Sequence, residues 1–139
     1  MPFLYLQQMN SVDFIKDVKT IAIIGLSDKP DRASYQVAEF LISRGFRIIP
    51  VNPMIREVFG LKAYPDLSSV PQDIVIDMID IFRKSEEVMP IVMDSISRNI
   101  KHIWMQEGVL NLEAAKYAQE HGATVAVDVC LMKAIKALL

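Results

Sequence analysis

The chain has 139 residues, a mass of 15.7 kDa, 52% hydrophobic residues and a formal net charge of −2. This length and composition predict a single folded domain over residues 1–139 and exclude an intrinsically disordered protein. The near-neutral charge argues against nucleic-acid binding, no apolar run is long enough for a membrane span, and the single cysteine, Cys130, leaves no internal disulfide, as is typical of a cytoplasmic protein.

Apolar runs alternate with helical patterns along the chain. Ser11 to Asp13 indicate a helix N-terminus, with Phe14, Ile15 and Val18 as its apolar face. The expected strands are Thr20 to Ile24, Phe46 to Val51, a short one after Gly60 near Ala63 and Tyr64, Ile74 to Ile79, Ile100 to Met105, and Thr124 to Val127. The expected helices are Ala33 to Arg44 before Gly45, one capped by Ser85, Leu112 to His121, and one from about Leu131, with a turn at Asp66 to Pro71. This alternation predicts an α/β fold with a doubly wound, mainly parallel sheet and helices on both faces.

The turn after the first strand has the features of a phosphate site. Gly25 ends the apolar run and permits a sharp turn and a close approach of ligand to backbone. The next helix would point its free N–H groups at this turn, where Ser27 or Ser34 can donate hydrogen bonds and Lys29 or Arg32 can supply positive charge. The turn predicts a phosphorylated nucleotide as ligand, and the alternative is an ordinary strand–turn–helix unit with solvated cations.

The same segment argues against NAD. Gly25 is the only glycine between the strand and Gly45, so the G-x-G-x-x-G pattern of dinucleotide-binding proteins is absent. The second strand also ends in Asn52, where an acidic residue would bind a ribose diol. We therefore expect a different nucleotide.

Polar or glycine-bearing turns follow four of the expected strands. In doubly wound sheets, ligands bind at the carboxyl ends of the strands, near the point where the strand order reverses. These turns should therefore converge on one crevice, and they are Gly25 to Arg32, Val51 to Pro53, Asp80 to Ser85, and Met105 to Gly108.

Five segments in register give the chain a recognisable pattern. They are Gly25-Leu26-Ser27-Asp28-Lys29-Pro30, Pro50-Val51-Asn52-Pro53, Asp80-Ile81-Phe82-Arg83-Lys84-Ser85-Glu86, Trp104-Met105-Gln106-Glu107-Gly108-Val109, and the late Asp128-x-Cys130. Over nearly its whole length the chain resembles the small, stand-alone CoA-binding proteins of bacteria and archaea, which are similar in fold to the CoA-binding domain of the succinyl-CoA synthetase alpha subunit. The resemblance implies a Rossmann-like fold and coenzyme A, or an acyl-CoA, as the ligand.

The resemblance also implies where this ligand would bind. The pyrophosphate and 3′-phosphate are expected near Gly25, Ser27, Lys29 and Arg32, and the adenosine near Val51 to Pro53. Glu107 is a candidate polar contact at a strand end, unless it only caps its own turn. The complete expected site is Gly25, Leu26, Ser27, Lys29, Arg32, Ser34, Val51, Asn52, Pro53, Ile81, Phe82, Arg83, Ser85, Gln106, Glu107 and Gly108.

The C-terminal segment departs from the family pattern. The family usually carries an arginine before the late cysteine and a Glu-His pair after it, whereas this chain has Val129 and Ala134-Ile135. The final helix is largely apolar, which predicts a surface for a homo-oligomer or a protein partner, of natural or engineered origin. Its residues would be Leu131, Met132, Ile135 and Leu138, with Met89 and Met93 of the Ser85 helix, and the alternative is a helix buried in its own domain.

No group of residues has the pattern of a catalytic or metal site. Cys130 follows a strand in apolar company, and neither His102 nor His121 has a cysteine or a second histidine at metal-site spacing. Asp77 and Asp80, three residues apart on one strand, would point to opposite faces. We therefore expect a CoA carrier, sensor or adaptor without its own catalysis. The alternatives are a protein-interaction scaffold with a lost ligand site and, less favoured, a component of an acyl-CoA-dependent transferase or ligase.

Overall fold

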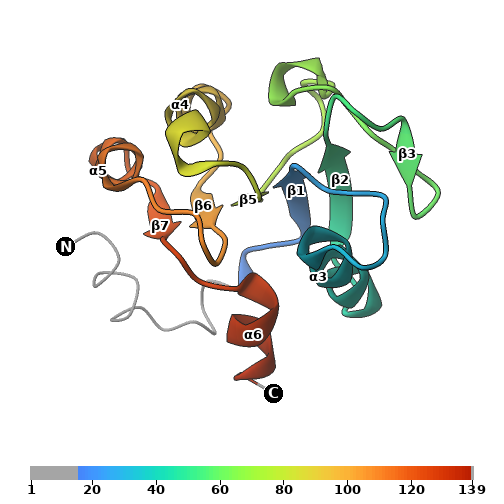
Figure 1. Ribbon diagram of the computed structural model, residues 1–139. Helices are drawn as coiled ribbons and strands as arrows, with labels where there is room; N and C mark the ends of the chain where they lie inside the picture. Colours follow the sequence, from blue (N-terminus) through green and yellow to red (C-terminus); the bar gives the residue numbers. More distant parts are fainter. Residues whose placement is uncertain (1–15, 139) are drawn as a thin grey trace.

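The computed structural model describes residues 16–138, whose strands form a parallel sheet and a separate hairpin. The sheet has the order β2-β1-β5-β6-β7, and every neighbouring pair is parallel (Figure 1). The predicted Rossmann-like, doubly wound fold is confirmed. The strands of the sheet are β1 (Thr20–Ile24), β2 (Arg47–Val51), β5 (Met78–Ile81), β6 (His102–Met105) and β7 (Thr124–Ala126).

Helices cover both faces of this sheet. They are α3 (Ala33–Ser43), α4 (Val88–Ser97), α5 (Leu112–Glu120) and α6 (Leu131–Lys136). The helices α3 and α6 lie on one face, and α4 and α5 lie on the other (Figure 1). Successive strand residues point to opposite faces, so Ile21 and Ile23 enter the core beside α3 and α6, whereas Ala22 and Ile24 enter the core beside α4 and α5. None of the helices within residues 16–138 has both the length and the apolar character needed to cross a membrane.

The central strand β5 begins later than the sequence suggests. We expected a strand over 74–79, but β5 starts at residue 78 and continues to residue 81. The reason is Asp77, whose carboxylate accepts hydrogen bonds from the backbone N–H groups of Lys19 and Thr20, each at 2.9 Å. The residues before it lie outside the sheet, and Val75 is 73% exposed.

The short strand expected after Gly60 is present as one half of a hairpin. It is β4 (Leu61–Lys62), which ends just before the expected Ala63-Tyr64 and pairs antiparallel with β3 (Glu57–Val58). Phe59-Gly60 joins them with φ values of 56° and 71°, and two positive φ values are what a tight hairpin turn requires. Tyr64 makes only an isolated parallel bridge to Val51.

The helix after β5 also begins differently from the prediction. We expected Ser85 to cap it, but a short 3₁₀ helix, η2 (Ser85–Glu87), precedes α4 and has Lys84 as its N-cap. The Ser85 hydroxyl instead accepts a hydrogen bond from the backbone N–H of Leu110 at 2.9 Å. It therefore connects two neighbouring loops at the carboxyl edge of the sheet.

Other boundaries agree with the sequence to within two residues. β6 begins at His102 and β7 ends at Ala126. The expected turn after Tyr64 contains a 3₁₀ helix, η1 (Leu67–Ser69), whose N-cap is Asp66. The expected helix start at residues 11–15 lies outside the described residues.

The C-terminal helix belongs largely to the core. Leu131 and Ile135 are 0% and 5% exposed because they pack in the cluster that also holds α3. Met132 packs against the same cluster, and Leu138 is 39% exposed. The prediction that Leu131 and Ile135 supply an exposed apolar surface is therefore wrong, and the alternative of burial is confirmed for these two residues.

The two α4 methionines do not extend that surface. Met89 and Met93 lie on α4, which covers the other face of the sheet from α6 (Figure 1). Met93 is 45% exposed, and Met89 packs partly against the α4 core. The residues expected at one interface therefore do not share a surface.

The loops that leave β1 and β5 come into close contact at Gly25. This residue has a φ of 92°, and its N–H donates to the carbonyl of Val51 at 2.7 Å. A Cβ atom on Gly25 would overlap the carbonyl oxygen of Phe82 and would lie 3.1 Å from Cδ of Arg83. Only glycine satisfies both the backbone angle and the space.

A carboxyl group is buried in the middle of the sheet. Asp80 of β5 lies between Ile23 and Trp104 on the neighbouring strands and is 0% exposed. Neither of its side-chain oxygens has a hydrogen-bond partner. Burial raises the pKa of Asp80 well above its ordinary value of 3.8. Asp77 is engaged at the start of the strand, so the two carboxyl groups do not act as a pair.

We predict that Gly25→Ala destabilises the protein by about 3 kcal/mol, because a positive φ costs an L-residue roughly 1–2 kcal/mol and the overlap with Phe82 adds a packing penalty. Gly45→Ala is the matched control, since Gly45 has a φ of 93° but no atom within 4 Å of an added Cβ. It should lose only the backbone part, about 1–2 kcal/mol. Urea denaturation measures both, and equal losses would contradict the close contact at Gly25.

We predict that Asp80→Asn changes how stability depends on pH. Above pH 3.8 the unfolded carboxyl loses its proton while the folded one keeps it, so the stability of the wild-type protein falls as the pH rises toward the folded pKa. Asparagine does not titrate, so the variant does not lose stability in this way. The stability of the variant relative to wild type should therefore increase from pH 4.5 to pH 7.5. Urea midpoints across this range test it, with Asp94→Asn on the exposed side of α4 as control. A difference that stays constant with pH would contradict the prediction.

Candidate functional site

The strand order reverses between β1 and β5, and a crevice opens at the carboxyl ends of these strands. The chain leaves β1 toward α3 on one face and leaves β5 toward α4 on the other, so the two connections diverge. Two cavities lie at this point, one on the side of α3 and one on the side of α4, and Gly25 lines both.

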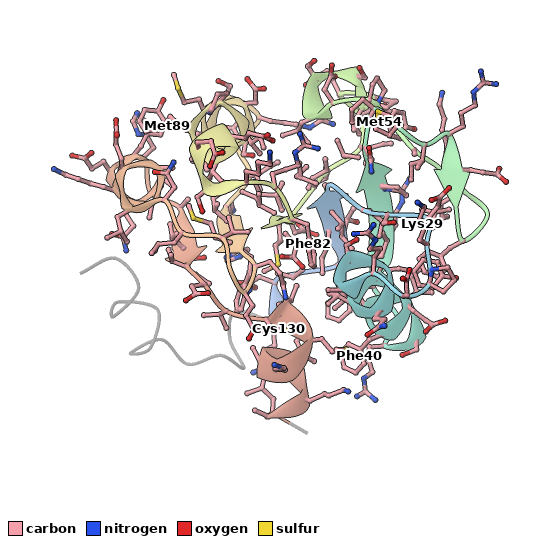
Figure 2. All side chains as sticks on the ribbon, viewed as in Figure 1. Lys29, Phe40, Met54, Phe82, Met89 and Cys130 are labelled. Atoms are coloured by element: carbon pink, nitrogen blue, oxygen red, sulfur yellow. The ribbon has the colours of Figure 1, made fainter. Side chains whose placement is uncertain are left out.

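The α3-side cavity, of about 630 Å³, is the larger and the more cationic. Its size is that of a small-ligand site. Lys29 and Arg32 contribute two positive charges against one carboxylate, Asp28. Three of its lining residues, Lys29, Met54 and Phe82, are marked in Figure 2. The complete lining is Gly25, Ser27, Asp28, Lys29, Arg32, Ala33, Ser34, Asn52, Met54, Ile55 and Phe82.

The N-terminus of α3 opens into this cavity without a side-chain cap. Its N-cap residue, Arg32, makes no capping hydrogen bond. The first N–H groups of a helix have no partner within the helix, and with the helix dipole they favour an anion at this position. Lys29 and Arg32 are both exposed beside it. The arrangement is suited to a phosphate group.

Hydrogen bonds within the turn fix its shape. The hydroxyl of Ser34 accepts from the N–H of Ser27 at 3.0 Å, and the hydroxyl of Ser27 accepts from the N–H of Lys29 at 3.1 Å. The amide of Asn52 donates to the carbonyl of Leu26 at 2.9 Å. Each serine hydroxyl keeps its own proton to donate, so both can still bind an anion.

The α4-side cavity, of about 270 Å³, has a different chemistry. Its walls are mainly apolar, and its one cation, Arg83, is outnumbered by Asp66, Glu87 and Asp94. The hydroxyl and backbone groups of Ser69, with the hydroxyl of Ser68, donate to Asp66 and lower the pKa of its carboxyl, so that it stays ionised. The complete lining is Ile24, Gly25, Val51, Pro53, Pro65, Asp66, Leu67, Arg83, Glu87, Ile91 and Asp94.

The structure brings most of the expected site residues to these two cavities. Those that line one or both are Gly25, Ser27, Lys29, Arg32, Ser34, Val51, Asn52, Pro53, Phe82 and Arg83. Leu26 follows Gly25 and Ile81 precedes Phe82 in the sequence, but the side chains of both are fully buried, in the cores on opposite faces of the sheet. Their backbone carbonyls accept hydrogen bonds from Asn52 and Gln106.

The remaining expected residues are tied into loops near β6. The Gln106 side chain accepts a hydrogen bond from the N–H of Leu131 at 3.3 Å. Glu107 pairs with Lys133 at 3.2 Å, and the Gly108 N–H donates to Asp128 at 2.7 Å. With Ser85 bonded to Leu110, these groups hold the β6 loop against α6 and η2.

Sequence reasoning missed several lining residues. Met54 and Ile55 follow the predicted Val51 to Pro53 corner, so extending that turn by two residues would have included them. Asp66, Glu87 and Asp94 carry no signal of this kind, because their approach to Gly25 depends on how η1 and α4 pack.

The cysteine and the histidines lie in other environments. Cys130 is buried at the start of α6 (Figure 2). His102 is at the amino end of β6, where its Nδ1 lies 2.7 Å from the hydroxyl of Thr124, and burial lowers its pKa. His121 Nδ1 lies 2.8 Å from the carbonyl of Tyr117. Residues 16–138 contain no cluster of three or more His, Cys, Asp or Glu able to hold a metal ion.

Comparison of the chain with known proteins identifies its family. Residues 19–136 match the family model for a CoA binding domain. The Bacillus subtilis protein YneT is 37% identical over 119 residues, which are 86% of this chain and 87% of that protein. A solved structure from Pyrococcus horikoshii is 32% identical with a TM-score of 0.88 and covers 96% of this chain and 94% of its own. The ADP-forming acetate–CoA ligase of Methanocaldococcus jannaschii is 33% identical over 66 residues, which are 48% of this chain but 9% of the ligase. The chain belongs to the CoA-binding domain family.

Proposed function

We propose that this protein binds coenzyme A, or an acyl-CoA, in the crevice at Gly25. The observation that carries the proposal is the α3-side cavity, where an uncapped helix N-terminus and two exposed cations face the same space. CoA carries several negative charges on its phosphates, and such groups are favoured at this position. Membership of the CoA-binding family supports the same ligand.

In this proposal the phosphates occupy the α3 side of the crevice. Lys29 and Arg32 supply charge, while Ser27, Ser34 and the first N–H groups of α3 supply hydrogen bonds. Gly25 allows the ligand to approach the backbone closely, because it has no side chain. The adenosine packs at the Val51 to Pro53 corner, which borders both cavities.

The protein acts as a binding module, that is, as a carrier, sensor or adaptor for CoA. Among the described residues, the cysteine and the histidines lie away from the crevice lining: Cys130 is buried at the start of α6, and His102 is at the amino end of its strand. The match to the acetate–CoA ligase covers 9% of the ligase, so it does not extend the ligase reaction to this chain.

Thermal unfolding with ligand tests the proposal. A ligand that binds only the folded state raises the melting temperature, and the stabilisation grows with the logarithm of its concentration relative to Kd. We expect a rise with CoA and acetyl-CoA that exceeds the rise with NAD at the same concentration. No shift with either CoA or acetyl-CoA would favour the scaffold with a lost ligand site. Hydrolysis of acetyl-CoA or transfer of its acetyl group would favour an enzyme.

We predict that Lys29→Ala and Arg32→Ala each weaken CoA binding about 10-fold at low salt, because each removes a charge-assisted hydrogen bond to phosphate. Both side chains are exposed, so the free energy of unfolding should change by less than about 0.5 kcal/mol. Lys116→Ala, an exposed lysine on α5, is the control for net charge. Isothermal titration calorimetry measures the affinities. Equal affinities for all three variants would remove Lys29 and Arg32 from the site.

A further inference from the structure

We propose that Glu87 sets the affinity of the crevice for phosphorylated ligands, because it holds Arg83 in an ion pair with which a phosphate group must compete. The inference rests on the proposed function and adds to it a residue that the ligand need not touch. In it, Glu87 acts through Arg83, as a competitor of the ligand for the guanidinium.

Arg83 lies at the junction of the two cavities. It lines the α4-side cavity, and its Cδ atom is 3.1 Å from the position that a Cβ of Gly25 would occupy. Gly25 also lines the α3-side cavity, where Lys29 and Arg32 stand. A phosphate bound over the Gly25 backbone is therefore within reach of the Arg83 side chain.

Glu87 engages the guanidinium on its α4 side. Its Oε2 atom accepts from Nε of Arg83 at 2.8 Å and from Nη2 at 2.7 Å. The two residues are four positions apart, and each side chain is 37% exposed. Pairs of this kind are weak in water, so a phosphate can displace the carboxylate.

The surrounding charges make this competition specific to Arg83. Lys29 and Arg32 face one carboxylate, Asp28, whereas Arg83 shares its cavity with Asp66, Glu87 and Asp94. Among these carboxylates, Glu87 makes the ion pair with Arg83. Removing its charge leaves Arg83 with one competitor fewer and should strengthen its attraction to an anion beside Gly25.

The mechanism predicts which ligands respond to Glu87 as well as the sign of the change in affinity. Only ligands with a phosphate at Gly25 compete for Arg83, so their affinity should depend on Glu87. Adenosine and pantetheine carry no phosphate, so their binding should not. The matching phosphorylated probes are ADP, which contains adenosine, and CoA, which contains both adenosine and pantetheine.

The test compares Glu87→Gln with Glu86→Gln by calorimetry at low ionic strength. Both variants remove one negative charge from η2, but among the described residues Glu86, which is exposed, makes no ion pair with Arg83. We expect Glu87→Gln to bind ADP and CoA about threefold more tightly than Glu86→Gln, the size expected of a half-exposed ion pair. Circular dichroism of both variants checks that they are folded.

A second comparison shows whether the effect passes through Arg83. In an Arg83→Gln background, Glu87→Gln and Glu86→Gln should have the same affinity for ADP, because the competing ion pair no longer exists. A threefold difference that persists in this background would overturn the mechanism.

The outcomes separate this inference from the proposed function. If wild-type protein binds CoA but Glu87→Gln and Glu86→Gln have equal affinities, the role of Glu87 is overturned and CoA binding stands. Weaker binding by Glu87→Gln would also overturn it, since Glu87 would then orient Arg83 toward the ligand. If wild-type protein binds neither CoA nor ADP, the proposed function fails and this inference fails with it.

Discussion

The backbone at Gly25 passes so close to the Phe82 carbonyl that no side chain fits between them, and this contact sits where the strand order reverses. Because β1 and β5 are neighbours there, the connections to α3 and α4 leave the same point in opposite directions. The floor of the crevice is thus bare backbone with cavities on both sides. A glycine is required by the fold and, through the same absence of a Cβ, gives a ligand access to the peptide groups.

The two sides of that floor differ in charge for structural reasons. On the α3 side, the helix begins directly after a turn that carries Lys29 and Arg32, so the helix dipole and the cations act in the same direction. On the α4 side, η2 comes first, and its acidic residue Glu87 is directed back to Arg83. An elongated, partly anionic ligand therefore meets a polarised site, which favours one orientation of its phosphates.

Sequence reasoning reached the parts of this design that depend on local pattern. The apolar run of β1 and the Gly25 turn predicted a buried parallel strand and a binding loop, because strand burial and glycine placement are local signals. The start of β5 was predicted too early. It is set by Asp77, which accepts hydrogen bonds from Lys19 and Thr20, and these residues are far from it in the sequence. The sequence also leaves the burial of Ile135 open, because periodicity marks an apolar face but does not show what covers it.

Asp80 is a carboxyl buried in the core next to the crevice. It lies two residues before Phe82, which follows the end of β5 and lines the α3-side cavity. A charged carboxyl without a hydrogen bond is costly in such a position, and burial raises the pKa of Asp80 and so favours its neutral form. The segment of α6 that packs on the α3 face of the sheet is apolar, with Leu131 and Ile135 in the shared cluster. β5 is buried through its apolar residues Met78, Ile79 and Ile81, and the chain continues from it directly to Phe82, whose carbonyl contacts Gly25.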